Sequence, residues 1–289
     1  MRQVPSSLPR PALSLHAPAR PALPRRVLLL AAAAVVAGCA VPTKPPPPSA
    51  ALAQPVRLMT SGGFTEAHQR LFPVFEQQTG GKVESAYGSS MGASTTSIPN
   101  RLARGEPADV VVLARSALDQ LVQQGHVVPG SQVDLVRSSI GLAVRAGAPV
   151  PDIGTEEKFR QLLLSAPSIA YSASASGTYY ETAMLKKMGI EAQVLPKSRK
   201  IVGDRVGTIV ARGDAAVGMQ QVSELLPIPG ITYVGRLPES VQHYTVFSAG
   251  ITTKAQNPEG ARALIRFYQS PAARTVIEKT GLEVVPPRP

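Results

Sequence analysis

The stretch Val56-Arg57-Leu58-Met59-Thr60-Ser61-Gly62-Gly63-Phe64 joins an expected strand to an expected helix through small residues. The run from Val56 to Thr60 is short and rich in residues that favour strands. Apolar residues then recur at helical spacing, at Phe64, Ala67, Leu71, Val74 and Phe75. Short β-rich runs and helical patterns keep alternating along the rest of the chain. This alternation predicts an α/β fold containing parallel sheets.

Two long extended runs, Ser138–Arg145 and Gln242–Thr252, bracket a second α/β unit. The closing helices, Pro258–Gln269 and Pro271–Thr280, each begin with a proline at a helix-opening position and need an apolar partner in the first unit. We therefore expect two lobes with mixed sheets flanked by helices and a ligand cleft between them. Lobe I would comprise residues 55–137 plus 246–289, and lobe II residues 138–245.

The segment 1–38 is expected to be a signal peptide. Arg25 and Arg26 precede a short apolar run, Val27–Ala37, and small residues follow it. This run is shorter than the roughly 20 residues of a membrane-spanning helix. The paired arginines also resemble a twin-arginine export signal.

The tetrapeptide Val36-Ala37-Gly38-Cys39 resembles a bacterial lipobox, in which Cys39 would be acylated. Residues 39–54 are rich in proline and would form a semi-rigid tether. The expected location is therefore the periplasm, with a lipid anchor at Cys39. An alternative cut after Ala51-Leu52-Ala53 would release a soluble periplasmic protein.

The composition excludes several classes of function. Removing residues 1–38 removes five arginines and no acids, which lowers the formal charge from +11 to +6. This residual charge suits an anionic ligand, but no basic cluster with interleaved aromatics indicates nucleic-acid binding. The chain has a single cysteine, so no intramolecular disulfide forms. His68, His126 and His243 lack metal-ligand spacing, and we expect no metal site and no cofactor.

Three expected strand ends are followed by glycine and hydroxyl residues. These loops are Thr60–Gly63, Gly88–Gly92 and Ser172–Thr178. Small side chains let a ligand reach backbone N–H groups, and a helix N-terminus favours negative charge. Each loop by itself is ordinary turn and capping sequence, but three together favour a shared site for a small anion.

The order of VRLMTSGGFTEA, SAYGSS, RLARGEPADVVVL, SASASGTYYE and VARGDAAVGMQQVSE resembles the molybdate-type (ModA-like) periplasmic substrate-binding proteins of ABC importers. The resemblance runs from about Val56 to Leu282, and its most specific piece is Gly105-Glu106-Pro107-Ala108-Asp109-Val110. It implies the two-lobed type II binding-protein fold, a small anionic ligand and an ABC permease as partner. It also implies a monomer that is not an enzyme.

The ligand contacts of this family transfer residue by residue. The resemblance places ligand-binding positions at Gly63, Ser89, Ser90, Ser176, Gly177, Gly203 and Gln221. Gly63 stands where the family usually carries a serine, and Gln221 replaces a tyrosine. These two departures favour a small carboxylate or another anion over molybdate itself. Arg205 lies next to Gly203 and could pair a carboxylate, although a solvated surface arginine is the simpler interpretation.

Two other functions fit parts of the pattern. Gly88-Ser89-Ser90-Met91-Gly92 matches the G-x-S-x-G elbow of α/β hydrolases, with Ser90 as nucleophile. This hydrolase would need His126 or His243, neither of which is expected in a suitable loop. A ligand sensor that signals to a membrane partner is the second alternative.

Overall fold

The computed structural model describes residues 52–286. The expected signal peptide, Cys39 and most of the tether lie outside these residues. Within residues 52–286 no helix has both the length and the apolar character needed to cross a membrane.

The first sheet has the strand order β11-β4-β10-β3-β1-β2. Strand β1 pairs in parallel with β2 and β3, whereas β10 runs antiparallel to β3 and β4. The strands are β1 (Val56–Ser61), β2 (Val83–Gly88), β3 (Val110–Ala114), β4 (Val133–Ser138), β10 (Thr245–Ile251) and β11 (Glu283–Val284). The glycines and serines that follow β1 and β2 therefore lie at the same edge of this sheet.

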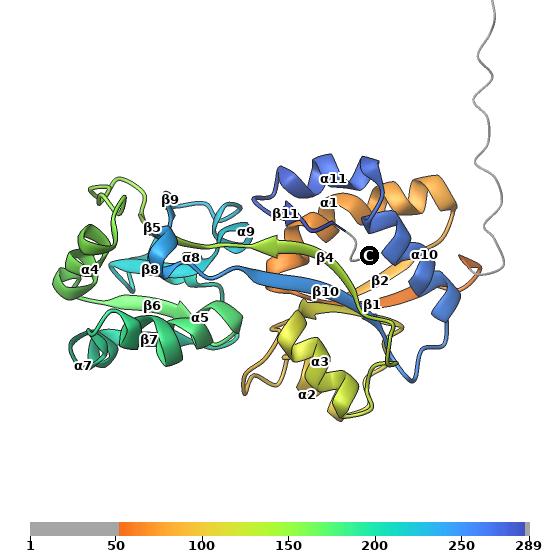
Figure 1. The fold of residues 1–289 in the computed structure, drawn as a ribbon. Coiled ribbons are helices and arrows are strands. Elements are labelled where there is room, and N and C mark those ends of the chain that lie inside the picture. Colours follow the sequence, from red (N-terminus) through yellow and green to blue (C-terminus); the bar gives the residue numbers. More distant parts are fainter. Residues whose placement is uncertain (1–51, 287–289) are drawn as a thin grey trace, which may run out of the picture. The chain divides into compact units, whose positions relative to one another are not determined.

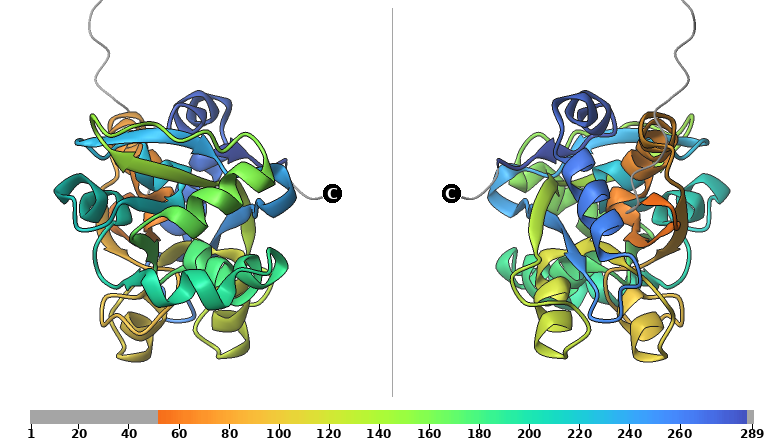
Figure 2. Two further views of the ribbon diagram at one scale, coloured as in Figure 1. Left: turned by 90° about the vertical axis from the view of Figure 1, so that its left-hand side faces the viewer. Right: turned by 90° about the vertical axis from the view of Figure 1, so that its right-hand side faces the viewer.

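Helices cover both faces of the first sheet. On one face, Phe64 and Leu71 of α1 pack with Leu264 of α10 and Ile277 of α11, and Figure 2 shows α11 beside α1. On the other face, α2 and α3 pack against β3 through Ile98 and Leu118. The bounds are α1 (Gly62–Thr79), α2 (Ile98–Ala103), α3 (Arg115–Gln123), α10 (Pro258–Tyr268) and α11 (Pro271–Glu278).

The second sheet has the order β7-β6-β8-β5-β9, with β6 parallel to β7 and β8 and the other pairs antiparallel. Its strands are β5 (Ile140–Arg145), β6 (Ile169–Ser172), β7 (Ser198–Ile201), β8 (Val217–Gln221) and β9 (Ile231–Arg236). Its helices are α4 (Glu156–Ser165), α5 (Ala175–Tyr179), α6 (Leu185–Lys187), α7 (Glu191–Val194), α8 (Val206–Arg212) and α9 (Val222–Leu225). A π-helical segment, η2 (Tyr180–Met184), joins α5 to α6, and 3₁₀ turns lie at η3 (Leu195–Lys197) and η4 (Glu239–Val241).

The chain passes between the sheets twice, along neighbouring strands. It leaves the first sheet at the end of β4 and enters the second with β5, and it returns from β9 to β10. Figure 1 shows β4 and β10 side by side on this path. The run expected as one strand from Ser138 is divided because Ser139 belongs to neither strand. The expectation of a two-lobed α/β fold with flanking helices is confirmed.

The end of the expected tether contacts the first lobe. Leu52 is 7% exposed and packs in the apolar cluster of α1 and β1, near Gly81. The backbone carbonyl of Gln54 accepts a hydrogen bond of 3.0 Å from Asn257 Nδ2. A cut after Ala53 would therefore remove a buried side chain from the first lobe.

Candidate functional site

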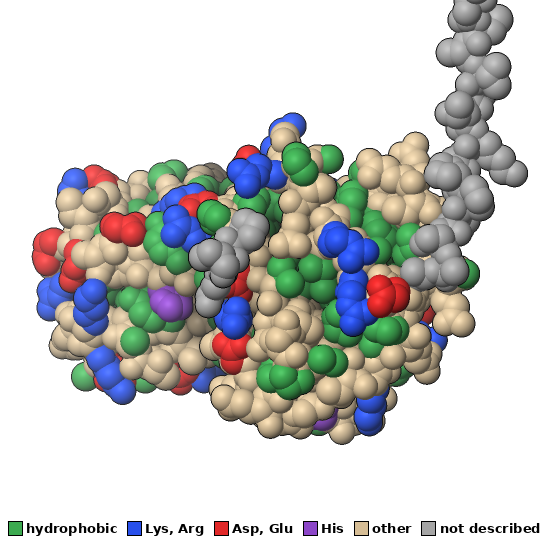
Figure 3. Space-filling model, turned by 45° about the vertical axis from the view of Figure 1, so that its right-hand side comes forward, with side chains coloured by type: hydrophobic (Ala, Val, Ile, Leu, Met, Phe, Trp, Pro, Cys, Tyr) green, Lys and Arg blue, Asp and Glu red, His purple; other side chains and the backbone are tan. Residues whose placement is uncertain are grey.

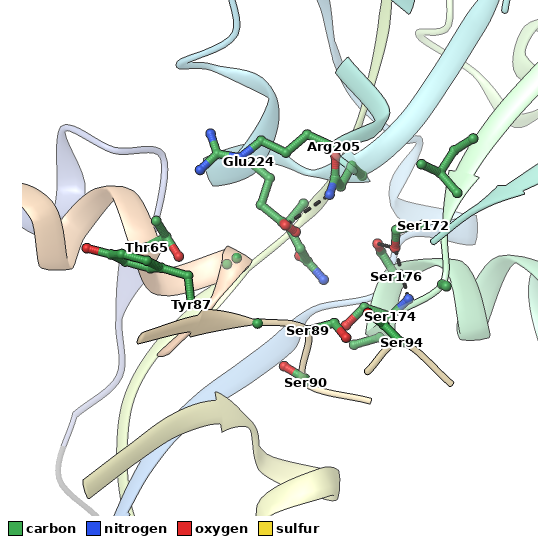
Figure 4. Close-up of a pocket in the computed structure, with 18 of the residues that line it drawn as sticks. Thr65, Tyr87, Ser89, Ser90, Ser94, Ser172, Ser174, Ser176, Arg205 and Glu224 are labelled. Atoms are coloured by element: carbon green, nitrogen blue, oxygen red, sulfur yellow. Dashed lines mark hydrogen bonds between the residues drawn. The ribbon is translucent and has the colours of Figure 1, made fainter. Parts of the chain in front are cut away.

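A cavity of about 490 Å³ lies between the two sheets, where the glycine and serine loops meet. Its lining comes from the start of α1, from the ends of β2, β6, β7 and β8 with the loops that follow them, and from the helices α5, α8 and α9. Figure 4 shows Ser89 and Ser94 facing Ser172, Ser174 and Ser176, while Glu224 and Arg205 lie close together away from these serines. The cavity therefore combines hydroxyl groups with two acidic residues, Asp204 and Glu224, and one arginine, Arg205.

Gly62 and Gly63 begin α1 at the wall of this cavity, and neither position has room for a side chain. A Cβ at Gly63 would lie 2.1 Å from the ring of Phe247, and a Cβ at Gly62 would lie 2.0 Å from Glu224 Oε1. The carbonyl of Gly63 also accepts a hydrogen bond of 2.8 Å from Ser223 Oγ. The start of α1 thus packs directly against the second lobe through α9.

Ser89 and Ser90 follow β2 and line the cavity. Ser90 is 1% exposed, and its Oγ accepts a hydrogen bond of 2.9 Å from the backbone N–H of Ala114. The Ser89 hydroxyl donates to the carbonyl of Met91 over 2.8 Å. Because Ser90 accepts from the backbone, its hydroxyl proton remains available as a donor to a bound anion.

The loop after β6 forms the opposite wall. Ser172 and Ser176 have their hydroxyl oxygens 3.1 Å apart, and both line the cavity. Gly177 is not among the lining residues: it packs behind them, where a Cβ would lie 1.6 Å from the carbonyl of Ser172. Gly203 lines the cavity with φ +78, a conformation that favours glycine.

Gln221 lines the cavity at the end of β8, where the chain crosses between the sheets. Its side chain is 2% exposed, and its amide lies 2.8 Å from Thr245 Oγ1. With the carbonyl turned toward Thr245, the amide nitrogen donates to Ser138 Oγ and Ser139 O. Gln221 thus bonds to both crossing segments and has fewer donors left for a ligand than an open side chain would have.

Glu224 is a lining residue that the sequence reasoning missed. It lies on α9, directly after β8, and its Oε1 accepts a hydrogen bond of 2.9 Å from Gln220 Nε2. The Gln220 carbonyl oxygen in turn accepts 2.9 Å from the backbone N–H of Val206. This second bond fixes the amide so that its NH₂ group faces the carboxyl.

Burial raises the pKa of Glu224 to about 7, and the positive charge of Arg205 and the Gln220 hydrogen bond oppose this rise. Arg205 directly precedes α8, makes no capping hydrogen bond with its side chain, and lines the same cavity. No ion pair with a carboxylate is found for Arg205 among residues 52–286. The cavity therefore holds a cation beside a carboxyl group that titrates near neutral pH.

Metal chemistry and serine hydrolysis gain no support from this geometry. Within residues 52–286 no group of histidine, cysteine and acidic side chains could hold a metal ion. None of the lining residues is a histidine. His243 instead stacks on Tyr179, with ring centroids 4.6 Å apart. On the face drawn in Figure 3, basic and acidic side chains are interspersed.

Comparison with known proteins gives two kinds of relative. A family model described as bacterial extracellular solute-binding protein matches residues 56–283. The aconitate isomerase of a Pseudomonas species is 45% identical over 240 residues, which cover 82% of this chain and 92% of that protein. The molybdate-binding protein ModA of Azotobacter vinelandii is 26% identical, with 80% of this chain and 91% of that protein covered.

A solved structure supports the fold. The periplasmic molybdate-binding protein of Azotobacter vinelandii superimposes with a TM-score of 0.65 at 20% identity, covering 81% of this chain and all of that one. The expected likeness to molybdate-type binding proteins of the type II fold is thereby confirmed. The expectation that the chain is not an enzyme was wrong, because a relative at 45% identity over most of the chain is named for an enzymatic activity. The quoted sequence segments mark the binding-protein fold, and although VARGDAAVGMQQVSE ends at Glu224, the resemblance gives this residue no role.

Proposed function

Because the chain belongs to the family of bacterial extracellular solute-binding proteins, we propose that it binds a small polycarboxylate between its lobes and isomerises it, as an aconitate isomerase does. The 45% identity to the Pseudomonas enzyme supports this proposal. The fold supplies the cleft, and the reaction depends on what lines it.

The observation that carries the proposal is the carboxyl group of Glu224 in the cavity, beside Arg205. A site that only stores an anion gains nothing from a carboxylate, because the two negative charges repel each other. A carboxyl whose pKa lies near neutral pH is the group that proton transfer requires. The cavity is therefore better suited to a reaction on an anion than to passive binding.

We assign binding of the carboxylates to the neutral donors and to Arg205. The hydroxyls of Ser89, Ser90 and Ser176 line two facing walls, and Gly63 and Gly203 allow close approach of the backbone. Gln221 contributes from the end of β8, and Gly177 packs behind the lining residues and holds the Ser172 loop in place. A guanidinium pairs a carboxylate through two parallel hydrogen bonds, which suits Arg205 to one of the substrate carboxylates.

The experiment is direct. The purified protein is incubated with cis-aconitate, and formation of trans-aconitate is followed by proton NMR; the reverse reaction is followed in a second sample. We expect both mixtures to reach the same equilibrium ratio. A protein that leaves both isomers unchanged would refute the isomerase assignment.

A second candidate function is delivery of a small anion, a molybdate-like oxyanion or a small carboxylate, to an ABC permease. The match of residues 56–283 to the solute-binding family favours it. Thermal unfolding measured with molybdate, sulfate, aconitate and small dicarboxylates separates the two functions. A ligand at about 100 times its Kd adds about 2.7 kcal/mol of stability, so selective stabilisation by molybdate would favour transport of the oxyanion.

The extracytoplasmic location follows from the family, and we assign the attachment to Cys39. Acylation of Cys39 would leave the proline-rich segment as a spacer between the membrane and a monomeric two-lobed body. Cys39→Ser should then release the protein from membranes in cell fractionation. Wild-type protein that is already soluble would contradict the anchor and support the cut after Ala53.

A further inference from the structure

Glu224 reaches from the second lobe to the first. It belongs to α9, which follows a strand of the second sheet, yet its Oε1 occupies the space beside Gly62 at the start of α1. A Cβ at Gly62 would lie 2.0 Å from Oε1 and 2.9 Å from Cδ. The carboxyl group therefore fits its position only because residue 62 has no side chain.

The two oxygens of this carboxyl group differ. Oε1 accepts the hydrogen bond from Gln220, whose amide is itself fixed by the N–H of Val206. Among residues 52–286 no donor to Oε2 is found. One oxygen is thus held in place, and the other has a lone pair available in a cavity that is large enough for a small polycarboxylate.

The charged group that acts on Glu224 lies on only one side of its carboxyl group. Arg205 at the start of α8 is the cation that faces it, whereas the glycines of α1 on the other side carry no charge. The other titratable groups lining the cavity are Asp204 and Tyr87. Asp204 Oδ1 already accepts a hydrogen bond of 2.7 Å from the backbone N–H of Arg205. Tyr87 is 40% exposed, at the end of β2.

We propose, resting on the isomerase function above, that Glu224 is the group that moves the substrate proton, and that Gln220 and the absence of a side chain at Gly62 position it. The ionised carboxyl removes a proton from the methylene carbon beside the double bond. The C–H electron pair forms a new double bond to the central carbon, and the old π pair moves to the far carbon. The protonated carboxyl exchanges part of its protons with solvent and then delivers a proton to that far carbon.

This sequence balances without any further reactant. One C–H bond breaks and one forms, the double bond moves by one carbon, and Glu224 ends ionised as it began. Charge that develops in between is shared with the substrate carboxylates, where the guanidinium of Arg205 lowers its energy. Burial raises the pKa of Glu224 to about 7, so the group can both accept and return a proton near neutral pH.

The test compares wild type with Glu224→Gln, which keeps the size of the side chain and the acceptor for Gln220. Three quantities are measured: the isomerisation rate, deuterium uptake from D₂O into aconitate, and binding of the saturated analogue propane-1,2,3-tricarboxylate by calorimetry. We expect the variant to lose about a hundredfold or more in rate and in deuterium uptake. The Kd of the analogue should change less than about fivefold. Glu157→Gln, at an exposed position on α4, removes the same charge and should behave as wild type.

A pH profile and a second variant complete the test. The kcat/KM of wild type should rise with pH through about 7 and then level off, because the ionised form is the base. Gly62→Ala pushes against the carboxyl group and should lower kcat more than it weakens binding of the analogue. Because Gly62→Ala keeps the carboxyl group of Glu224 but displaces it, this variant tests whether the rate depends on the position of the carboxyl group.

The outcomes are distinct. Wild type that does not isomerise aconitate refutes the proposed function and this inference with it. If wild type is active and Glu224→Gln isomerises aconitate within threefold of its rate, the inference alone is overturned. Loss of rate in Asp204→Asn would then assign the proton transfer to Asp204. Loss of both rate and analogue binding in Glu224→Gln would make Glu224 a binding residue and would also overturn the inference.

Discussion

Replacing Glu224 by glutamine should stabilise the unliganded protein at alkaline pH and leave its stability unchanged in acid. Burial raises the pKa of this carboxyl from 4.5 to about 7. The folded state therefore binds the proton more tightly than the unfolded state does. This contribution to stability is fully present below pH 4.5 and is lost as the pH rises toward 7.

The size of the effect follows from this pKa. One pKa unit corresponds to about 1.4 kcal/mol, which sets an upper limit of roughly 3 kcal/mol on the cost of the ionised form. Glu224 is only partly buried, so solvent in the cavity screens part of that cost, and we expect about 1–2 kcal/mol. For a domain of this size, each kcal/mol shifts the Tm by about 2–4 °C.

Thermal unfolding of wild type and Glu224→Gln at pH 5 and pH 8.5 tests the expectation. The variant should unfold about 3–6 °C above wild type at pH 8.5, and the difference should be much smaller at pH 5. The exposed Glu157→Gln corrects for the change in net charge. An equal difference at both pH values, or a Glu224→Gln that is less stable at pH 8.5, would refute the reasoning.

Three other substitutions have outcomes that the structure predicts. Arg205→Gln should weaken calorimetric binding of propane-1,2,3-tricarboxylate about ten- to a hundredfold, because a charged hydrogen bond contributes roughly 1.5–3 kcal/mol. Arg160→Gln, at a half-buried position that does not line the cavity, should leave this binding unchanged. Ser90→Ala should weaken binding of the analogue. It should also lower the free energy of unfolding in urea by about 1–3 kcal/mol, because it leaves the N–H of Ala114 without an acceptor. An unchanged free energy of unfolding would contradict that hydrogen bond. His68 is buried between Tyr268 and Ser85, and burial lowers its pKa to about 4. Wild type should therefore lose stability as the pH falls from 6.5 to 4, by up to roughly 3 kcal/mol. His68→Gln should flatten this acid slope in urea titrations at several pH values, and an unchanged slope would assign it to other groups.

Much of the fold could be read from local patterns. The β1 run, the glycines after it and the helical spacing from Phe64 onward all act within one strand–helix unit, and the structure has that unit. Strands β7 and β9 have no clear local signal in the sequence, because β7 carries exposed Arg199 and Lys200 and β9 is half-buried along most of its length. Their pairing comes from neighbours in the second sheet, which a local pattern does not contain.

The loops of the candidate site could also be predicted from short sequence segments, whereas the role of Glu224 could not. Gly62, Ser90 and Ser172 belong to glycine- and serine-rich loops at strand ends, which is a signal that sequence carries. Glu224 is one acid in a short helix, and its meaning depends on Gly62 and Arg205, which are distant in sequence. A signal is nevertheless present: Gln220 and Gln221 end a buried strand and Glu224 follows it, at the strand end where α/β folds place their clefts.

The contact between Gly62 and Glu224 also couples the evolution of the two positions. A β-carbon at position 62 and a carboxyl group at position 224 would occupy the same space. A substitution at one position therefore changes which residues fit at the other. Gly62→Ala should be harmful beside glutamate and nearly neutral beside alanine at 224, a sign of epistasis that a double-mutant cycle would measure. Lineages that carry a larger residue at 62 are therefore expected to have given up the acid at 224, and the chemistry with it.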